Sequence, residues 1–170
     1  MNILVFSDSH GRASNLLEAL RRQIKRPDAV VFLGDGLRDI SYCELGGATL
    51  FAVEGNCDLY SSYGDINAEE EILVTLGGKK IMMVHGHAYG VKSGLARIVM
   101  AAARKGADIV LFGHTHQALE RYIPAGETEY GIELEKPLWL FNPGAAAESS
   151  WGCVEIDDKG RVALSHGRLY

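Results

Sequence analysis

Cysteine and proline are both scarce in this chain of 170 residues, which contains three Cys and four Pro. The cysteines, at positions 43, 57 and 153, are odd in number, and no two of them have the Cys-x-x-Cys spacing. The sequence therefore predicts no disulfide framework, and this cysteine usage is typical of a reducing compartment. On this ground we expect the protein to be cytoplasmic.

Long hydrophobic runs and an excess of basic residues are also missing. The N-terminal apolar run, Ile3 to Phe6, is too short for a signal-peptide core, and no stretch approaches the ~20 apolar residues of a membrane span. The formal net charge is −5, whereas a protein that coats nucleic acid or an anionic membrane needs a dense basic surface. We therefore expect no membrane partner, and the charge disfavours a nucleic-acid partner.

The composition that remains is that of a compact globular protein. The chain is 47% hydrophobic and 23% charged, with 20 Gly and no linker, internal repeat or low-complexity tract. A chain of this length buries roughly 68–70% of its unfolded surface on folding, which is enough for one core. We expect residues 1–170 to form a single domain.

Short β-branched or aliphatic runs recur along the chain and predict strands. They are Ile3–Phe6, Ala29–Leu33, Thr49–Val53, Ile72–Leu76, Ile81–Val84, Asp108–Phe112, Leu138–Phe141, Cys153–Ile156 and Val162–Leu164. Helical periodicity predicts helices over Ser14–Ile24 and Gly94–Arg104, and turn residues at 77–78 and 157–160 predict hairpins. Strands separated by helices favour parallel pairing, so we expect an α/β fold with a β-sandwich or a pair of mixed sheets flanked by helices.

Polar side chains follow the predicted strands. The segments are Ser7-Asp8-Ser9-His10-Gly11, Gly34-Asp35-Gly36, Gly55-Asn56-Cys57-Asp58, His85-Gly86-His87, Gly113-His114-Thr115-His116 and Asn142-Pro143-Gly144. Five of the six His residues lie in these segments. Because the carboxyl ends of strands in open α/β sheets open into one crevice, we expect these side chains to converge.

The residue types in this cluster indicate a metal site. Imidazoles, carboxylates and one amide oxygen, without a thiolate pair, suit Mn, Fe, Zn, Co or Ni. The seven candidate ligands are too many for one tetrahedral ion and suit two ions that share a carboxylate, an arrangement used for phosphoester hydrolysis. They are Asp8, His10, Asp35, Asn56, His85, His114 and His116.

The order of these motifs resembles that of the calcineurin-like metallophosphoesterase superfamily. Asp-x-His, Gly-Asp, Gly-Asn-x-Asp, His and Gly-His-x-His follow one another between residues 8 and 116, and the chain length and Asn142-Pro143-Gly144 resemble the small YfcE-like phosphodiesterases. The resemblance implies a four-layer α/β/β/α sandwich and a dinuclear metal site in which Mn is the expected metal. It also implies that a hydroxide bridging the metals attacks phosphorus in a small phosphodiester substrate.

Carried over position by position, the resemblance implies two sets of ligands that share Asp35. One metal would be held by Asp8, His10, Asp35 and His116. The other would be held by Asp35, Asn56, His85 and His114. Every ligand of the family pattern is present.

One position departs from the family pattern. Many members have His where this chain has Cys57, and that His lies near the leaving group, so the identity of the general acid is open. We favour Cys57 as a small hydrophobic spectator over a ligand or redox-sensitive thiol. The candidate catalytic residues are Asn56, Asp58 and His87; for Asp58 and His87 we favour a supporting role around the metals over direct contact with the substrate.

Two rival functions remain. A non-catalytic protein-binding scaffold of the same fold, as in the retromer subunit, would tolerate the loss of ligands, and none is lost here. A nuclease would need a basic track, which the sequence lacks. The sequence leaves open the physiological substrate, the native metal and whether the chain forms a homo-oligomer.

Overall fold

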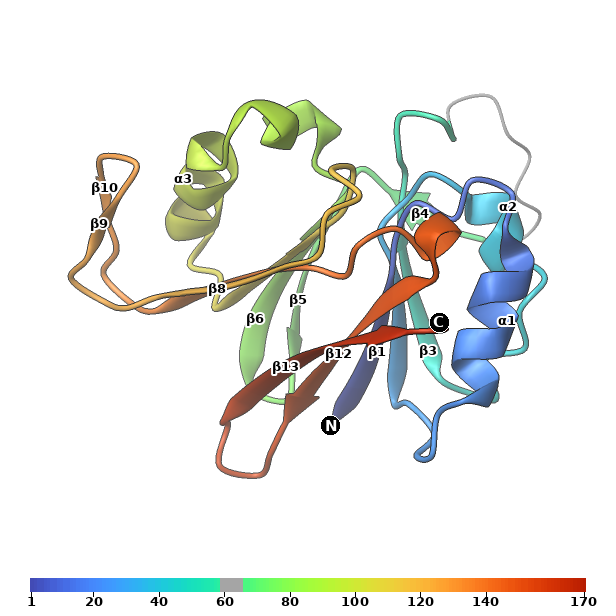
Figure 1. Ribbon diagram of the computed structural model, residues 1–170. Helices are drawn as coiled ribbons and strands as arrows, with labels where there is room; N and C mark the ends of the chain where they lie inside the picture. Colours follow the sequence, from blue (N-terminus) through green and yellow to red (C-terminus); the bar gives the residue numbers. More distant parts are fainter. Residues whose placement is uncertain (59–65) are drawn as a thin grey trace.

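The computed structural model describes residues 1–58 and 66–170, and among these residues two large β-sheets pack face to face between helices (Figure 1). The first sheet has the strand order β13 (Val162–Arg168), β12 (Ser150–Ile156), β1 (Asn2–Phe6), β2 (Ala29–Phe32), β3 (Thr49–Val53) and β4 (Ala68–Glu69). The second has the order β5 (Glu71–Leu76), β6 (Lys79–Val84), β7 (Ile109–Phe112), β11 (Leu138–Asn142) and β8 (Leu119–Ile123). A separate ribbon pairs β9 (Thr128–Glu129) with β10 (Ile132–Glu133).

The helices lie outside the sheets. The α-helices are α1 (Ala13–Arg21), α2 (Leu37–Ile40) and α3 (Ala96–Lys105), and the 3-10 helices are η1 (His87–Tyr89), η2 (Val91–Ser93) and η3 (Ala146–Glu148). Figure 1 shows α1 and α2 on the outer face of the first sheet and α3 on the outer face of the second. This is the α/β/β/α arrangement that the resemblance implied.

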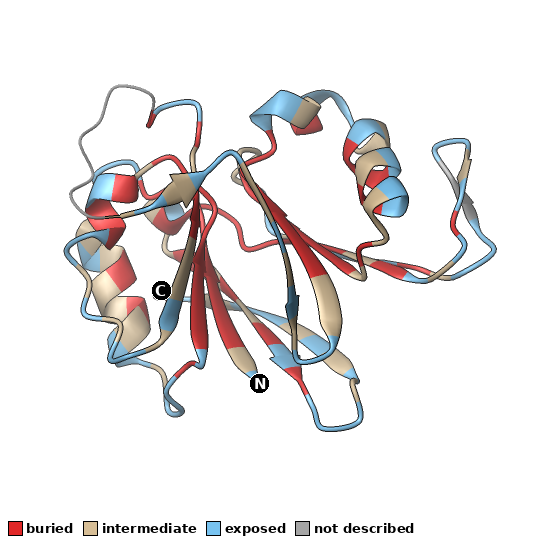
Figure 2. Cartoon of the chain, turned by 180° about the vertical axis from the view of Figure 1, so that it is seen from behind, coloured by how far each residue is buried: buried red, intermediate tan, exposed pale blue. Residues whose placement is uncertain are grey.

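Alternation along the strands builds the layers. On β1, Ile3 and Val5 point into the core between the sheets, whereas Leu4 and Phe6 pack with α1. On β6, Met83 belongs to the core between the sheets and its neighbours pack with α3. Both faces of the central strands are therefore buried, as Figure 2 shows, and continuous apolar runs are the sequence pattern of such strands.

Parallel pairing brings the functional loops to one end of the sandwich. Strands β1, β2 and β3 are parallel neighbours in the first sheet, and β6, β7 and β11 are parallel neighbours in the second. Their carboxyl ends lie at the upper end of the molecule in Figure 1. The two predicted hairpins are also present, as the antiparallel pairs β5–β6 and β12–β13.

The first predicted helix differs from the observed one. Helix α1 ends at Arg21, so Ile24 does not lie on its buried face, and its side chain is fully exposed. The α-helical pattern stops after Arg22, because the Gln23 N–H bonds the Leu20 carbonyl three residues back, and Pro27 disfavours helical backbone just before it.

The cysteines and the helices were both subjects of expectations from composition. Cys43, Cys57 and Cys153 are all free thiols. Among residues 1–58 and 66–170, none of the helices has the length and apolar character that a membrane-spanning helix needs.

Candidate metal centre

The predicted ligands lie in loops that leave the carboxyl ends of strands from both sheets. Asp8 follows β1 and Asp35 follows β2, whereas His85 follows β6 and His114 follows β7. Hydrogen bonds join these loops. The Asp8 N–H donates to the Gly34 carbonyl at 2.9 Å within the first sheet, and the His114 N–H donates to Asp8 Oδ2 at 2.9 Å between the sheets. The site is therefore built where the two sheets meet.

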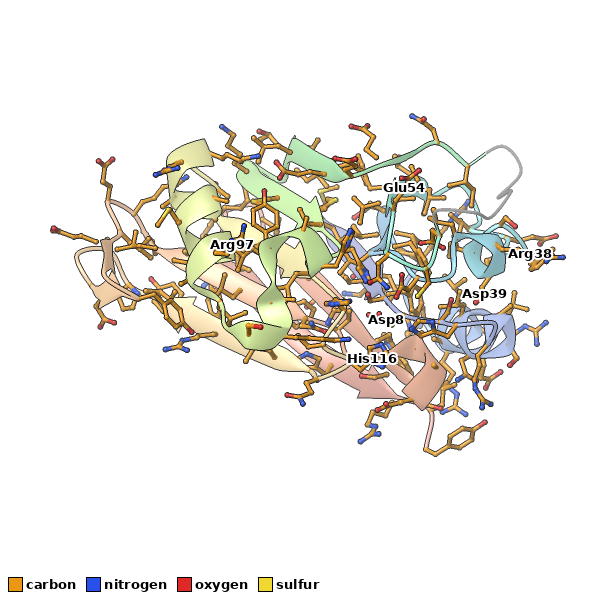
Figure 3. All side chains as sticks on the ribbon, turned by 90° about the horizontal axis from the view of Figure 1, so that it is seen from above. Asp8, Arg38, Asp39, Glu54, Arg97 and His116 are labelled. Atoms are coloured by element: carbon orange, nitrogen blue, oxygen red, sulfur yellow. The ribbon has the colours of Figure 1, made fainter. Side chains whose placement is uncertain are left out.

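Asp8, His10 and His116 form the first ligand group. His116 Nε2 lies 3.2 Å from Asp8 Oδ1 and 3.3 Å from His10 Nε2, and His10 Nε2 lies 3.8 Å from Asp8 Oδ1. Donor atoms bound tetrahedrally to one ion at about 2.0–2.1 Å are about 3.3 Å apart. The spacing of the three donor atoms therefore suits one shared cation. Figure 3 shows Asp8 and His116 close together between the two sheets.

The second ligand group is centred on the buried imidazole of His85. His85 Nε2 lies 3.1 Å from His114 Nδ1, 3.2 Å from Asn56 Oδ1 and 3.5 Å from Asp35 Oδ2. Its other nitrogen, Nδ1, donates to the Leu33 carbonyl at 2.7 Å. That hydrogen bond places the proton on Nδ1 and leaves the lone pair of Nε2 facing the group, the tautomer that a metal ligand needs.

One carboxylate oxygen lies between the two groups. Asp35 Oδ2 is 3.5 Å from His85 Nε2 and 3.7 Å from His10 Nε2. The other oxygen, Oδ1, accepts the Cys57 N–H at 2.8 Å, which fixes the orientation of the carboxylate. Asp35 is thus positioned to be shared by two cations.

The donor atoms fit metal ions in two respects. Asp8 Oδ1 is buried and, among the residues that the structure describes, has no hydrogen-bond partner, although Oδ2 of the same carboxylate accepts both the Ser7 hydroxyl and the His114 N–H. A buried anionic oxygen without a partner is costly. In addition, ring nitrogens of two imidazoles face one another in each group. A cation in each group would satisfy all these atoms.

The charges of the cluster already favour positive charge at its centre. Without a cation, burial lowers the pKa of His85, but the hydrogen bond that a protonated Nε2 makes to Asp35 and the charges of Asp8 and Asp35 outweigh it and raise that pKa. Burial would raise the pKa of Asp35, yet the hydrogen bonds from His85 and from the Cys57 backbone keep it far below the ordinary range. Burial and the charge of His85 lower the pKa of His114 to about 4, so this imidazole is neutral and able to bind a cation at neutral pH.

Backbone strain is concentrated on the ligands. Five of the seven predicted ligands have positive φ: Asp8 at 55°, His10 at 44°, Asp35 at 59°, His114 at 65° and His116 at 61°. Each such residue costs of order 1–3 kcal/mol and persists only where its surroundings hold it. Strain of this kind is typical of functional sites.

Asp58 and Asn142 hold the ligand loops. The buried Asp58 carboxylate accepts the N–H groups of residues 35, 36, 37 and 55, at 2.7–3.1 Å. The Asn142 amide donates to the Gly113 carbonyl and to Thr115 Oγ1, on either side of His114. These contacts fit the supporting role that the sequence favoured for Asp58; a direct catalytic role for Asp58 stays a prediction.

The other candidates lie at the rim. His87 is exposed, with its ring centroid 5.3 Å from that of His85 and 6.1 Å from that of His114. Burial and the charge of His85 lower its pKa. Cys57 is exposed, and its thiol lies within reach of His10 and Asp35; its interpretation as a small hydrophobic spectator stays a prediction.

Sequence reasoning missed three residues that support the site. Ser7 and Ser9 flank Asp8, and both are buried and hydrogen-bonded to carboxylates. Their position beside a ligand was a signal that could have identified them. Asp39 lies inside α2, where an acidic residue is ordinary, and no sequence feature distinguishes it.

The chain is similar to a known protein family and to several known proteins. The calcineurin-like phosphoesterase superfamily domain matches residues 1–159. A probable metallophosphoesterase of Bacillus subtilis, YsnB, is 32% identical over 145 residues, which are 85% of this chain and 75% of the relative. A probable metallophosphoesterase of Methanothermobacter thermautotrophicus is 29% identical over 148 residues, which are 85% of this chain and 77% of the relative.

Solved structures share the fold. A phosphoesterase-like protein of Streptococcus pneumoniae superposes with a TM-score of 0.67 at 23% identity, over 98% of this chain and 97% of the other. An archaeal phosphodiesterase gives 0.63 at 21% identity, over 98% and 99%. Vps29 of Entamoeba histolytica complexed with Zn²⁺ gives 0.62 at 17% identity, over the full length of both chains.

Proposed function

The chain belongs to the calcineurin-like phosphoesterase superfamily, and on this premise we propose that it hydrolyses small phosphodiesters with two divalent cations, Mn²⁺ first among them. Family membership and the ligand groups support the general activity of a metal-dependent phosphoesterase. The preference for diesters, the pair of ions and the choice of Mn²⁺ are the proposal.

The observation that carries the proposal is the position of Asp35 Oδ2. This oxygen lies 3.7 Å from a donor atom of the first ligand group and 3.5 Å from a donor atom of the second. A shared carboxylate would hold two cations at the short separation, roughly 3.5–4 Å, at which metal pairs act on phosphate esters.

Two such cations would supply Lewis acidity, lowering the pKa of water toward ~7 and attracting the non-bridging phosphoryl oxygens. The chain's own residues set the charge of the site. Asp8 and Asp35 are the anionic ligands, and Asn56 and the imidazoles are neutral donors, so two divalent cations would keep net positive charge for an anionic substrate. His87 lies at the rim with a pKa lowered by burial and by the charge of His85, so it can accept a proton there.

A protein-binding scaffold is the second candidate function. The likeness to Vps29 favours it only at the level of fold, because the identity is 17%. Against it, all seven predicted ligands are present and six of them fall into the two donor groups described above, with Asn56 beside them. A chain selected only for docking would have no reason to keep strained backbone at five of these residues.

The test is a direct assay on the purified chain. With added Mn²⁺ it should hydrolyse bis(p-nitrophenyl) phosphate without any partner protein, and faster than p-nitrophenyl phosphate. Chelation should abolish turnover and Mn²⁺ should restore it. Absence of turnover with each of Mn²⁺, Ni²⁺, Co²⁺, Fe²⁺ and Zn²⁺ would instead favour the scaffold.

We also propose a cytoplasmic location and a small-molecule phosphate ester as the partner, rather than nucleic acid or a membrane. The three free cysteines and the net charge of −5 support this.

A further inference from the structure

The loop between β1 and α1 carries two ligands that are held in different ways. The carboxylate of Asp8 is fixed directly, because its Oδ2 accepts both the Ser7 hydroxyl at 2.5 Å and the His114 N–H at 2.9 Å. His10 has a side chain that is one-third exposed and a backbone φ of 44°. The position of the His10 ring therefore depends on what holds the backbone on either side of it.

Asp39 holds that backbone. It lies in α2, is only 5% exposed, and its Oδ2 accepts the Ser9 hydroxyl at 2.5 Å and the Gly11 N–H at 2.8 Å. These two donors belong to the residues immediately before and after His10. Figure 3 labels Asp39 on the α2 side of Asp8.

The surrounding chain is shaped to admit this contact. A Cβ added to Gly36, at the start of α2, would lie 2.0 Å from Ser9 Oγ and 2.9 Å from Asp39 Oδ2. Gly36 also has φ of 141°, which an L side chain rarely adopts. Any larger residue there would separate Asp39 from Ser9.

We infer that Asp39 is a positioning residue for one of the two cations: it holds His10 in the strained conformation that completes the group of Asp8, His10 and His116. This inference rests on the proposed function and deepens it, because it assigns a support to one ligand group only. The second group is held by different contacts, from Leu33 to His85 and from Asp58 to the Asp35 loop. Loss of the Asp39 charge should therefore weaken one cation and spare the other.

The charge matters because both donors converge on a single oxygen. Hydrogen bonds to a carboxylate are about twice as strong as those to a neutral acceptor. Asp39→Asn keeps the shape of the side chain and removes the charge, so the hydrogen bonds from Ser9 and Gly11 weaken, while the His10 N–H keeps its bond to the Asp35 carbonyl at 3.1 Å. Ser9→Ala removes one of the two donors and should act in the same direction, less strongly.

The experiment measures Mn²⁺ binding by calorimetry and by electron paramagnetic resonance, which separates a spin-coupled Mn pair from an isolated ion. Wild type should bind two ions. Asp39→Asn should bind one with unchanged affinity and the other about 10–100-fold more weakly, the range for loss of a group that orients a metal ligand. Binding of one ion with unchanged affinity shows that the variant is folded. Activity that is lost at limiting Mn²⁺ should return at saturating Mn²⁺.

Asp108→Asn is the matched control. Asp108 likewise accepts one backbone N–H, from Lys80 at 2.7 Å, and one side-chain donor, Lys136 at 2.8 Å, but it lies at the opposite end of β7 from the site. Its Mn²⁺ binding should equal that of wild type. Equal binding of both ions by wild type and Asp39→Asn, or equal weakening of both, overturns the inference while leaving the proposed function standing. A wild-type chain that binds no divalent cation overturns the proposed function itself.

Discussion

Asp35 is the residue on which both ligand groups depend. Its Oδ2 faces His10 on one side and His85 on the other, so removing it takes a donor from each group. A histidine such as His116 belongs to one group only. The consequences of losing the two residues should therefore differ in kind.

We predict that Asp35→Ala lowers phosphodiesterase activity more than His116→Ala does, and by more than the about 10–100-fold expected for a group that only orients a ligand. Turnover and bound Mn²⁺ per chain, measured together, test this. Asp157→Ala, on an exposed hairpin, is the control and should behave as wild type. A fully active Asp35→Ala variant would rule out the shared carboxylate.

Cys57 leads to a prediction about leaving groups. A general acid contributes about 10²–10⁴-fold by protonating the departing oxygen, and its help matters most for basic alkoxides. The chain has a thiol where the resemblance implies His in many family members, and burial together with Asp35 raises the pKa of that thiol. Rates should therefore depend steeply on leaving-group pKa and favour acidic alcohols such as phenols.

Cys57→His should flatten that dependence and help poor leaving groups most. The measurement is a series of phosphodiesters of graded leaving-group pKa, run on both proteins with saturating Mn²⁺. Equal slopes for the two proteins would point to another proton donor, with His87 at the rim the first to test.

At the residue scale the sequence predicted which side chains gather but not how they are held. The candidate ligands are recognisable in the sequence because Asp, His and Asn recur after apolar runs. The positive φ of Asp8 and His10 is not readable, since it depends on contacts with residues far along the chain, such as Asp39. The exposure of Cys57 was unpredictable for a similar reason, because only the folded loop shows which way its side chain points.

At the scale of elements, burial made the central strands predictable, whereas exposure hid the edge strand Leu119–Ile123. Thr49–Val53 was predicted with its observed bounds, and the other predicted strands agree to within a few residues. Leu119–Ile123 was missed because its three middle residues are exposed, so neither an apolar run nor an alternating pattern marks it. It pairs with β11 at the edge of the second sheet.

Gly34 lies where the loop after β2 meets the loop after β3. It lies two residues after β2 with φ of 93°, and a Cβ there would lie 2.5 Å from Gly55 N and 2.7 Å from Gly55 Cα. Gly34→Ala should therefore lower the free energy of unfolding by about 2–5 kcal/mol, from backbone strain plus overpacking. It should also weaken Mn²⁺ binding, because it separates the loops that carry Asp35 and Asn56.

Gly78 offers the matched control. It lies in the β5–β6 hairpin with φ of 77°, and a Cβ there would meet nothing within 4 Å. Gly78→Ala should cost only the left-handed backbone strain, about 1–2 kcal/mol, and leave Mn²⁺ binding unchanged. Denaturant unfolding and Mn²⁺ titration of both variants separate the two effects; equal costs would mean that the loops can move apart freely.

For the whole molecule, the metal site lies where two sheets meet, each covered by its own helices. Ligands from the first sheet, such as Asp8, face ligands from the second, such as His116. The same end of the sandwich gathers four buried carboxylates, from Asp8, Asp35, Asp39 and Asp58. Cations bound there would both join the sheets and compensate the anionic charge, so they should stabilise the entire fold rather than one loop.

We therefore predict that Mn²⁺ raises the unfolding temperature in a concentration-dependent way. A ligand that binds only the native state at 100 times its Kd adds about 2.7 kcal/mol, and in a chain of this size each kcal/mol shifts the unfolding temperature by about 2–4 °C, which gives a rise of about 5–11 °C. Asp35→Ala should lose most of this rise, whereas Asp157→Ala should keep it. Differential scanning calorimetry across an Mn²⁺ series is the measurement. A rise that is the same in Asp35→Ala and in wild type would place the stabilising ion outside the two ligand groups, because no cation shared through Asp35 could then account for it.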